Sequence, residues 1–269
     1  MKTALFILSL SLSILSSAQD TLQNRIRHIN LGLALCFSNT YDEGASPLFY
    51  SGMGPGLLAA FEKHKKKHYS SLGFSFNYTN EEHTRIKPYS RSSVNSIYFM
   101  LSVSEAWQIM QKKSEKFLFY LGFDLRLIGD LRIFNSYGNN SYNYAASFSP
   151  GLYSRAEYPL TFLNRNWKAN ASFTIPVISV WLRPDYSYSI PEGFQKPDDS
   201  FSRQALNSLR TGFWNQSFNT VFDFELEYLL KNNNAFAAGY TWTFFEISPG
   251  YNSYISGRHQ FYFQSKFFF

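Results

Sequence analysis

Strict alternation of apolar and polar side chains is the feature that most constrains this chain. Between positions 117 and 127 every odd residue is apolar, whereas the even positions include Asp124 and Arg126. Successive side chains of a β-strand point to opposite faces of the sheet, while a helix repeats every 3.6 residues. The alternation therefore predicts a strand with one apolar face and one polar face.

Ten segments of this kind can be counted along the chain. They lie at about residues 28–39, 52–63, 69–79, 93–110, 117–127, 143–156, 166–183, 212–230, 234–246 and 257–269. Pro150 cannot donate a ladder hydrogen bond, so we expect a bulge or break there. The alternation also slips at Ser179, close to Pro176, which predicts a second bulge.

The connections between these segments alternate in length. Short polar joints fall near 64–68, 111–116, 158–165 and 231–233, and longer ones near 40–51, 80–92, 129–142, 184–211 and 247–256. Short turns at one end and long loops at the other are typical of membrane β-barrels, as is an even strand number. An even number also returns both chain ends to the same side of the membrane.

The composition favours a sheet surrounded by lipid. Phe, Trp and Tyr make up 19% of the residues, yet the mean hydropathy is −0.25. Apolar residues that face lipid and alternate with polar residues that face a lumen account for both values. A soluble secreted β-sandwich is the rival interpretation, and it would need the aromatic faces to pack around one dry core.

The C-terminal strand carries a resemblance to a known class. Phe261, Phe263, Phe267 and Phe269 share one face, and the opposite face carries Gln260, Tyr262, Gln264 and Lys266. A strand of this pattern that ends on an aromatic residue resembles the C-terminal signal of outer-membrane β-barrels. The resemblance implies that the four phenylalanines act as an assembly signal for the barrel-assembly machinery. It also implies a location in the outer membrane, in contact with lipid and lipopolysaccharide.

The N-terminus agrees with this location. Lys2, the apolar run 4–15 and the small residues 16–18 are typical of a signal peptide over 1–18. The run of about 12 apolar residues is too short for a membrane-spanning helix. We expect one barrel domain over 19–269. The start at Gln19 and the stretch 175–186 resemble small barrels of Bacteroidota, most of which have no assigned activity.

Charged residues of inward parity form the candidate functional feature. We expect them to build a polar network in the lumen: Asp124, Arg126, Arg155, Lys168, Asp223, Glu225 and Glu227. Buried charges must be paired, and small barrels fill their interiors with side chains. The favoured interpretation is therefore a plugged, salt-bridged lumen. A polar track for small solutes or ions is the alternative.

The sequence offers little support for an enzyme, a metal site or a cofactor. None of the five His residues belongs to a metal-binding motif, and the single Cys36 cannot form an intramolecular disulfide. A hydrolase would have to use His83 with Glu81 and Glu82, or His259 with Asp130, near the external rim. We expect no enzyme, no cofactor and no metal.

Two further features leave alternatives open. The dense basic cluster at 63–68 is interpreted as a hydrophilic turn in preference to a site for polyanions, and we expect no nucleic-acid partner. Tyrosines in or beside the long loops could bind a glycan, a peptide or a partner protein: Tyr137, Tyr142, Tyr144, Tyr186, Tyr188, Tyr251 and Tyr254.

These observations predict an all-β, antiparallel, up-and-down transmembrane β-barrel of about ten strands, with eight or twelve as alternatives. We expect a structural or accessory role in the cell envelope, and a larger envelope complex is a candidate partner. A narrow solute channel, a binding barrel and a hydrolase follow in that order.

Overall fold

The computed structural model describes residues 26–43, 46–65, 67–83, 93–112, 117–135, 142–162, 165–183, 209–248 and 253–269. The predicted signal peptide lies outside these ranges, as does most of the 184–211 loop, together with Tyr137, Tyr186, Tyr188 and Tyr251. Within the described ranges, no helix is long and apolar enough to cross a membrane.

The described chain is built from β-strands alone. Twelve are present: β1 (Ile26–Asp42), β2 (Ser46–Lys65), β3 (His68–His83), β4 (Ser93–Lys112), β5 (Phe117–Phe134), β6 (Tyr142–Phe162), β7 (Arg165–Pro176), β8 (Ser179–Leu182), β9 (Leu209–Gly212), β10 (Ser217–Leu229), β11 (Ala235–Ile247) and β12 (Tyr254–Phe268).

The sheet closes into a barrel of ten strands. Neighbouring strands run antiparallel from β5 back through β1 to β12 and on through β11, β10 and β7 to β6, and pairing of β5 with β6 closes the ring. The short β8 and β9 pair with each other beyond the ends of β7 and β10 and therefore prolong those two strands. The predicted ten-stranded barrel is confirmed, and a β-sandwich is excluded.

The register around the ring fixes how far the strands tilt. Starting at Leu33, the pairings through β2 to β5 arrive at Ala146 on β6, whereas those through β12 to β7 arrive at Tyr158. The two routes differ by 12 residues, which is the stagger of the barrel. A rise of about 3.3 Å per residue and strands about 4.8 Å apart then give a tilt of about 40°.

The apolar faces of the strands point outward. Leu33 is 69% exposed, whereas Asn30 on the same strand is 1% exposed. Phe263 is 57% exposed, whereas Lys266 on the same strand is 1% exposed. On β1 the outward apolar residues run from Ile29 to Phe37, about the nine to eleven residues that a tilted strand needs to cross a bilayer. The apolar residues of the alternating pattern therefore face hydrocarbon on the outside of the barrel.

The bulge expected near Pro176 is present, but the break expected at Pro150 is not. β6 stays in register with β5 through Pro150. Pairing between β6 and β7 ends at Pro176 and resumes at Val180 of β8, with one extra residue on the β7–β8 side. Val177 N donates to Pro150 O at 2.9 Å. The nitrogen of Pro150 points to the same side as its oxygen, so the N–H that proline lacks would face the irregular pairing with β7 and β8. The neighbouring strand therefore accommodates the defect.

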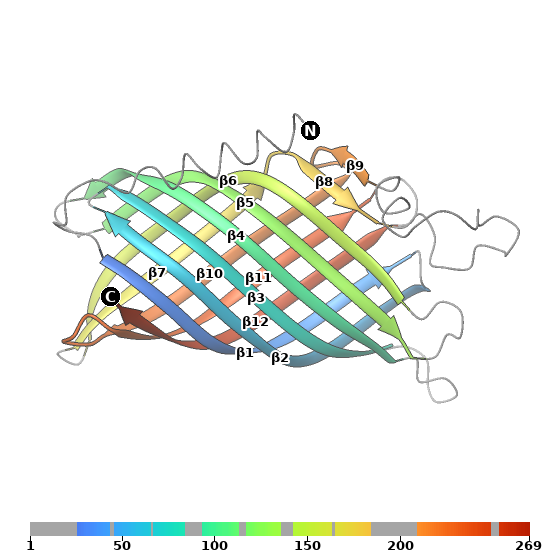
Figure 1. The fold of residues 1–269 in the computed structure, drawn as a ribbon, viewed down its shortest axis with the longest axis horizontal. Coiled ribbons are helices and arrows are strands. Elements are labelled where there is room, and N and C mark those ends of the chain that lie inside the picture. Colours follow the sequence, from blue (N-terminus) through green and yellow to red (C-terminus); the bar gives the residue numbers. More distant parts are fainter. Residues whose placement is uncertain are drawn as a thin grey trace, which may run out of the picture.

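The two ends of the barrel differ. Figure 1 shows the beginning of β1 and the end of β12 at one end, and β8 and β9 lie toward the other. The start of β1 and the end of β12 share their end of the barrel with the short turns, so this end faces the periplasm. One expected long loop is wrong: β1 ends at Asp42 and β2 begins at Ser46, so most of the expected connection at 40–51 is strand.

We expect arginine at the middle of the outer wall to destabilise the barrel. Leu33→Arg should lower the free energy of unfolding by about 2–4 kcal/mol, and Ile29→Arg near the periplasmic edge by about 0–1 kcal/mol. Urea titration in liposomes, followed by the heat-dependent shift on SDS gels, measures both. Equal costs at the two positions would contradict the assigned depth.

Candidate functional site: the lumen

The interior of the barrel is mostly polar, and its charges gather in two layers. The outer layer lies toward the external end and contains Asp42, Glu81, Asp130, Arg132, Arg183 and Arg258. The inner layer lies toward the periplasmic end and contains Glu62, Arg155, Glu157, Lys168, Glu225, Glu227 and Lys266. All are buried except Lys168, which is partly buried.

Arg132 of β5 forms the first half of the outer layer. Its Nη1 lies 3.3 Å from Asp42 Oδ2, and its Nη2 lies 3.1 Å from Glu81 Oε2. Arg183, which follows β8, places Nη2 2.6 Å from Asp42 Oδ1. Asp42 on β1 is four strands from β5 and four from β7 in the ring, so these contacts cross the lumen.

The second half of the outer layer joins opposite walls. Arg258 Nη2 of β12 lies 2.5 Å from Asp130 Oδ2 of β5, and these two strands are five apart by either route. The Asp130 carboxylate also accepts hydrogen bonds from Ser96 Oγ, at 2.6 Å, and from the Tyr254 hydroxyl. Tyr254 was expected in an external loop, but it begins β12 and points inward.

Aromatic rings cover the guanidinium groups of the outer layer. Arg258 Cζ lies 4.4 Å from the centre of the Tyr98 ring, and Arg183 Cζ lies 5.2 Å from that of Tyr254. The apolar cluster beside them includes Tyr98, Ile128, Ala145, Trp181, Phe245, Ile247 and Tyr254. Arginine suits such a position, because its planar group can bond to carboxylates at the edge and stack on rings at the face.

Lys266 of β12 is the centre of the inner layer. Its Nζ lies 2.6 Å from Glu225 Oε1, 2.5 Å from Glu227 Oε1 and 3.5 Å from Glu62 Oε2. Lys168 Nζ lies 3.0 Å from Glu227 Oε2. These contacts join β2, β12, β10 and β7 through two lysines.

Arg155 of β6 completes the inner layer. Its Nε donates to Glu157 Oε1 at 2.7 Å, and its Cζ lies 4.4 Å from the centre of the Tyr69 ring on β3. His64 Nδ1 on β2 lies 3.9 Å from Glu157 Oε1. Because β2 and β6 are four strands apart, this contact beside the inner layer crosses the lumen, and it is an ion pair only when the imidazole is protonated.

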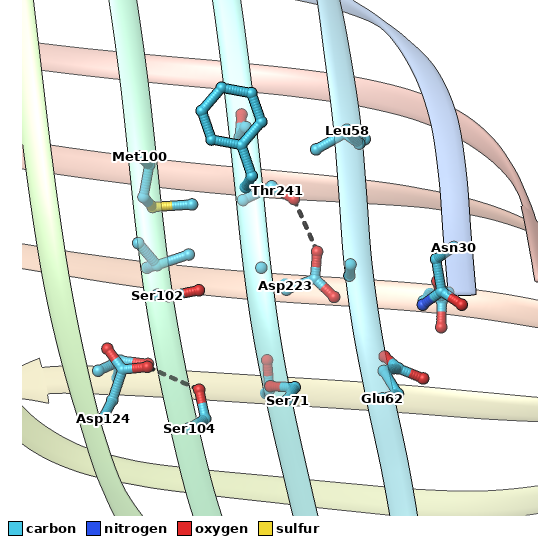
Figure 2. Close-up of a pocket in the computed structure, with 18 of the residues that line it drawn as sticks. Asn30, Leu58, Glu62, Ser71, Met100, Ser102, Ser104, Asp124, Asp223 and Thr241 are labelled. Atoms are coloured by element: carbon cyan, nitrogen blue, oxygen red, sulfur yellow. Dashed lines mark hydrogen bonds between the residues drawn. The ribbon is translucent and has the colours of Figure 1, made fainter. Parts of the chain in front are cut away.

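A polar chamber of about 160 Å³ lies between the layers. All ten barrel strands contribute to its wall. Figure 2 shows two acids on separate parts of that wall: Asp124 accepts a hydrogen bond from Ser104, and Asp223 accepts one from Thr241, each at 2.6 Å. A chamber of this size and polarity can hold several water molecules.

The charges of the two layers nearly cancel. The outer layer has three acids and three arginines, and the inner layer has four acids against three cations. Asp124 pairs with Arg126 at 2.9 Å. Asp223 makes no ion pair within the described part of the chain, and the Thr241 and Tyr262 hydroxyls donate to it instead.

The predicted lumen residues fall into three groups. Arg155, Lys168, Glu225 and Glu227 lie together in the inner layer, Asp124 and Arg126 form a separate pair, and Asp223 lies in the chamber wall. Sequence reasoning missed Lys266 and the whole outer layer. Inward parity was a usable signal for Lys266, which alternates with Phe267. For Asp42, Glu81, Asp130 and Arg132 that signal was lost, because they lie at strand ends that were predicted to be loops. Arg183 and Arg258 lie within predicted strands, and the parity of Arg258 was a usable signal, as it was for Lys266.

His259 and Asp130, considered together for a hydrolase, do not come together. His259 points outward, where its Nδ1 lies 2.7 Å from the Tyr240 hydroxyl, whereas Asp130 points into the lumen. Glu81 is held by Arg132 and Arg258. Cys36 is buried on the inner face. No group of three potential metal ligands occurs within the described ranges.

The comparisons with known proteins found barrels of low similarity. No family model matches the chain, and no curated protein matches it. A mutant of the TodX monoaromatic hydrocarbon channel is 6% identical, covering 91% of this chain and 90% of its own, with a TM-score of 0.33. The β domain of the Bordetella autotransporter BrkA is 11% identical, with 89% and 98% covered and a TM-score of 0.35. An outer-membrane channel from Pseudomonas putida F1 is 8% identical, with 93% and 98% covered and a TM-score of 0.32.

The location rests on the surface of the barrel itself. Only helices and closed barrels can cross hydrocarbon, because every backbone polar group must be bonded within the protein. This chain forms a closed barrel with an apolar outer belt. It is an outer-membrane protein.

We expect removal of the central lysine to destabilise the inner layer. Lys266→Met leaves three buried glutamates close together and should cost about 3–5 kcal/mol in unfolding free energy. Lys231→Met, in an exposed turn, should change the stability by less than about 0.5 kcal/mol. Urea titration of the gel shift measures both variants. If Lys266→Met leaves the unfolding free energy unchanged, the three glutamates do not depend on the lysine.

Proposed function

We propose that this protein is a structural or accessory barrel of the outer membrane whose lumen is plugged by its own side chains. The observation that carries the proposal is the pair of ionic layers, each with contacts that cross the lumen. Ten strands also give a diameter little above that of eight-stranded barrels, which side chains can fill.

A passing ion would have to separate buried pairs in both layers. Removing one partner of a buried pair costs about 3–5 kcal/mol, because the other charge is left without compensation. The outer layer ties β1, β5 and β12 together, and the inner layer ties β2, β6, β10 and β12 together. These ties favour a rigid lumen that strengthens the wall.

A narrow solute channel is the second candidate. The polar chamber between the layers favours it, since a conducting path would already be wetted at its middle. For this candidate, both layers would have to open while the wall stays intact.

Recordings in planar bilayers distinguish the two candidates. We expect no steady conductance from the wild type, from Arg258→Ser in the outer layer or from Lys266→Ser in the inner layer. The double variant should conduct, because only then is each layer weakened. The heat-dependent gel shift confirms that each variant remains a barrel. Steady wild-type conductance that changes in Glu225→Gln would overturn the plugged lumen and favour the channel.

An accessory role also requires a partner in the envelope. Crosslinking in intact cells, followed by purification under denaturing conditions, identifies any larger complex. Contacts with the barrel-assembly machinery through Phe261, Phe263, Phe267 and Phe269 belong to the same proposal. They should be transient and restricted to newly made chains.

A further inference from the structure

Basic side chains form a cluster on the outer wall at the periplasmic end. This basic rim consists of Arg27, Lys63, Lys65 and Lys67. Arg27 of β1 is the direct register partner of Lys63 of β2, and both have the parity of the lipid-facing residues. Arg27 and Lys63 are therefore directed away from the lumen, unlike the lysines of the inner layer, and Lys67 lies in the exposed turn that follows β2.

An apolar furrow lies on the same wall, closer to the middle of the membrane. It has a volume of about 630 Å³. Leu31, Leu33, Leu57, Phe74 and Phe263 form its apolar lining, and the small residues Gly32 and Ala59 also contribute. Because the small residues expose the wall between larger side chains, the furrow can take an extended hydrocarbon chain.

The furrow and the basic rim follow each other along the same strands. On β2 the outward positions run from Ala59 in the furrow through Phe61 to Lys63. On β1 they run from Leu31 through Ile29 to Arg27. The cations thus begin where the apolar belt ends. Lysine and arginine side chains at this depth extend their charged heads to the level of the lipid headgroups.

One acid lies beside the rim, and it is already held by neighbours. Glu105 Oε2 lies 2.6 Å from His68 Nε2, and Ser70 Oγ donates to Glu105 Oε1 at 2.7 Å. Glu105 also interacts electrostatically with Lys63. Among the described side chains of this region, four basic groups lie near one acidic group, so the formal charges of these side chains sum to a positive value.

We propose that this wall is a binding site for an anionic phospholipid of the inner leaflet. One acyl chain lies in the furrow, and the phosphate lies against Arg27 and Lys63. A lipid surrounds this wall in any case, so the specific claim is the preference for an anionic headgroup. The inference depends on the membrane location and is independent of whether the lumen conducts.

Native mass spectrometry of the purified, detergent-released protein tests the site. The probes are phosphatidylglycerol and phosphatidylcholine with identical acyl chains. We expect phosphatidylglycerol to be retained in preference. Arg27→Gln and Lys63→Gln should each weaken its retention about fivefold and leave phosphatidylcholine unchanged. Ala59→Phe fills the furrow and should weaken retention while the charges stay in place.

Matched controls separate the site from general effects. Lys231→Gln removes a basic residue from another periplasmic turn, and Ala238→Phe enlarges an outward alanine on β11; both should bind like the wild type. The gel shift confirms folding. Equal retention of the two lipids, or unchanged retention in the rim variants, overturns the proposal. Binding of glycerol phosphate alone as tight as that of the lipid would assign the rim to a free anion and overturn it as well.

Discussion

Hydrocarbon offers no hydrogen bonds, and this constraint governs the rest of the structure. A sheet in such a solvent must close on itself so that no edge is left unpaired. Ten strands with a stagger of 12 residues satisfy the backbone and also fix which inward side chains face each other. The Asp130–Arg258 pair exists because closure brings β5 and β12 to opposite sides of one narrow lumen. The ionic layers are thus a consequence of the ring, and they stabilise it in turn.

Much of the architecture could be predicted because alternation has a direct physical cause. The outward and inward faces of β5 were predictable from the sequence, since Asp124 and Arg126 could not face lipid at low cost. The lumen network was harder to foresee. Arg132 meets Asp42, 90 positions earlier in the chain, and that pairing depends on strand count and stagger. No local pattern contains either quantity. Four of the six outer-layer residues, namely Asp42, Glu81, Asp130 and Arg132, also lie at strand ends where the alternation gave no signal.

The two prolines show a second limit of predictions made from local sequence: an expected irregularity can be absent. Pro150 and Pro176 were each expected to disturb their own strand. In the barrel, the N–H that Pro150 lacks would face the pairing between β6 and β7. One bulge between β7 and β8 accommodates its absence. β6 therefore keeps its register with β5, which is the pairing that closes the ring. The bulge predicted near Pro176 is thus confirmed, whereas the break predicted at Pro150 is absent, because the opposite strand carries the irregularity.

Charged residues are distributed differently inside the lumen and on the rim of this barrel. The net charge of the chain does not show this difference. The chain has a formal charge of +6, yet the outer layer sums to zero and the inner layer has one excess acid. The positive excess must therefore come from residues outside the two layers, and the basic rim is part of it. Most charges inside the barrel pair with one another, because an unpaired one would be buried at high cost. Charges on the rim face headgroups and water and have no such requirement. Two populations of the same residue types, separated by one layer of backbone, thus serve the lumen and the membrane surface independently.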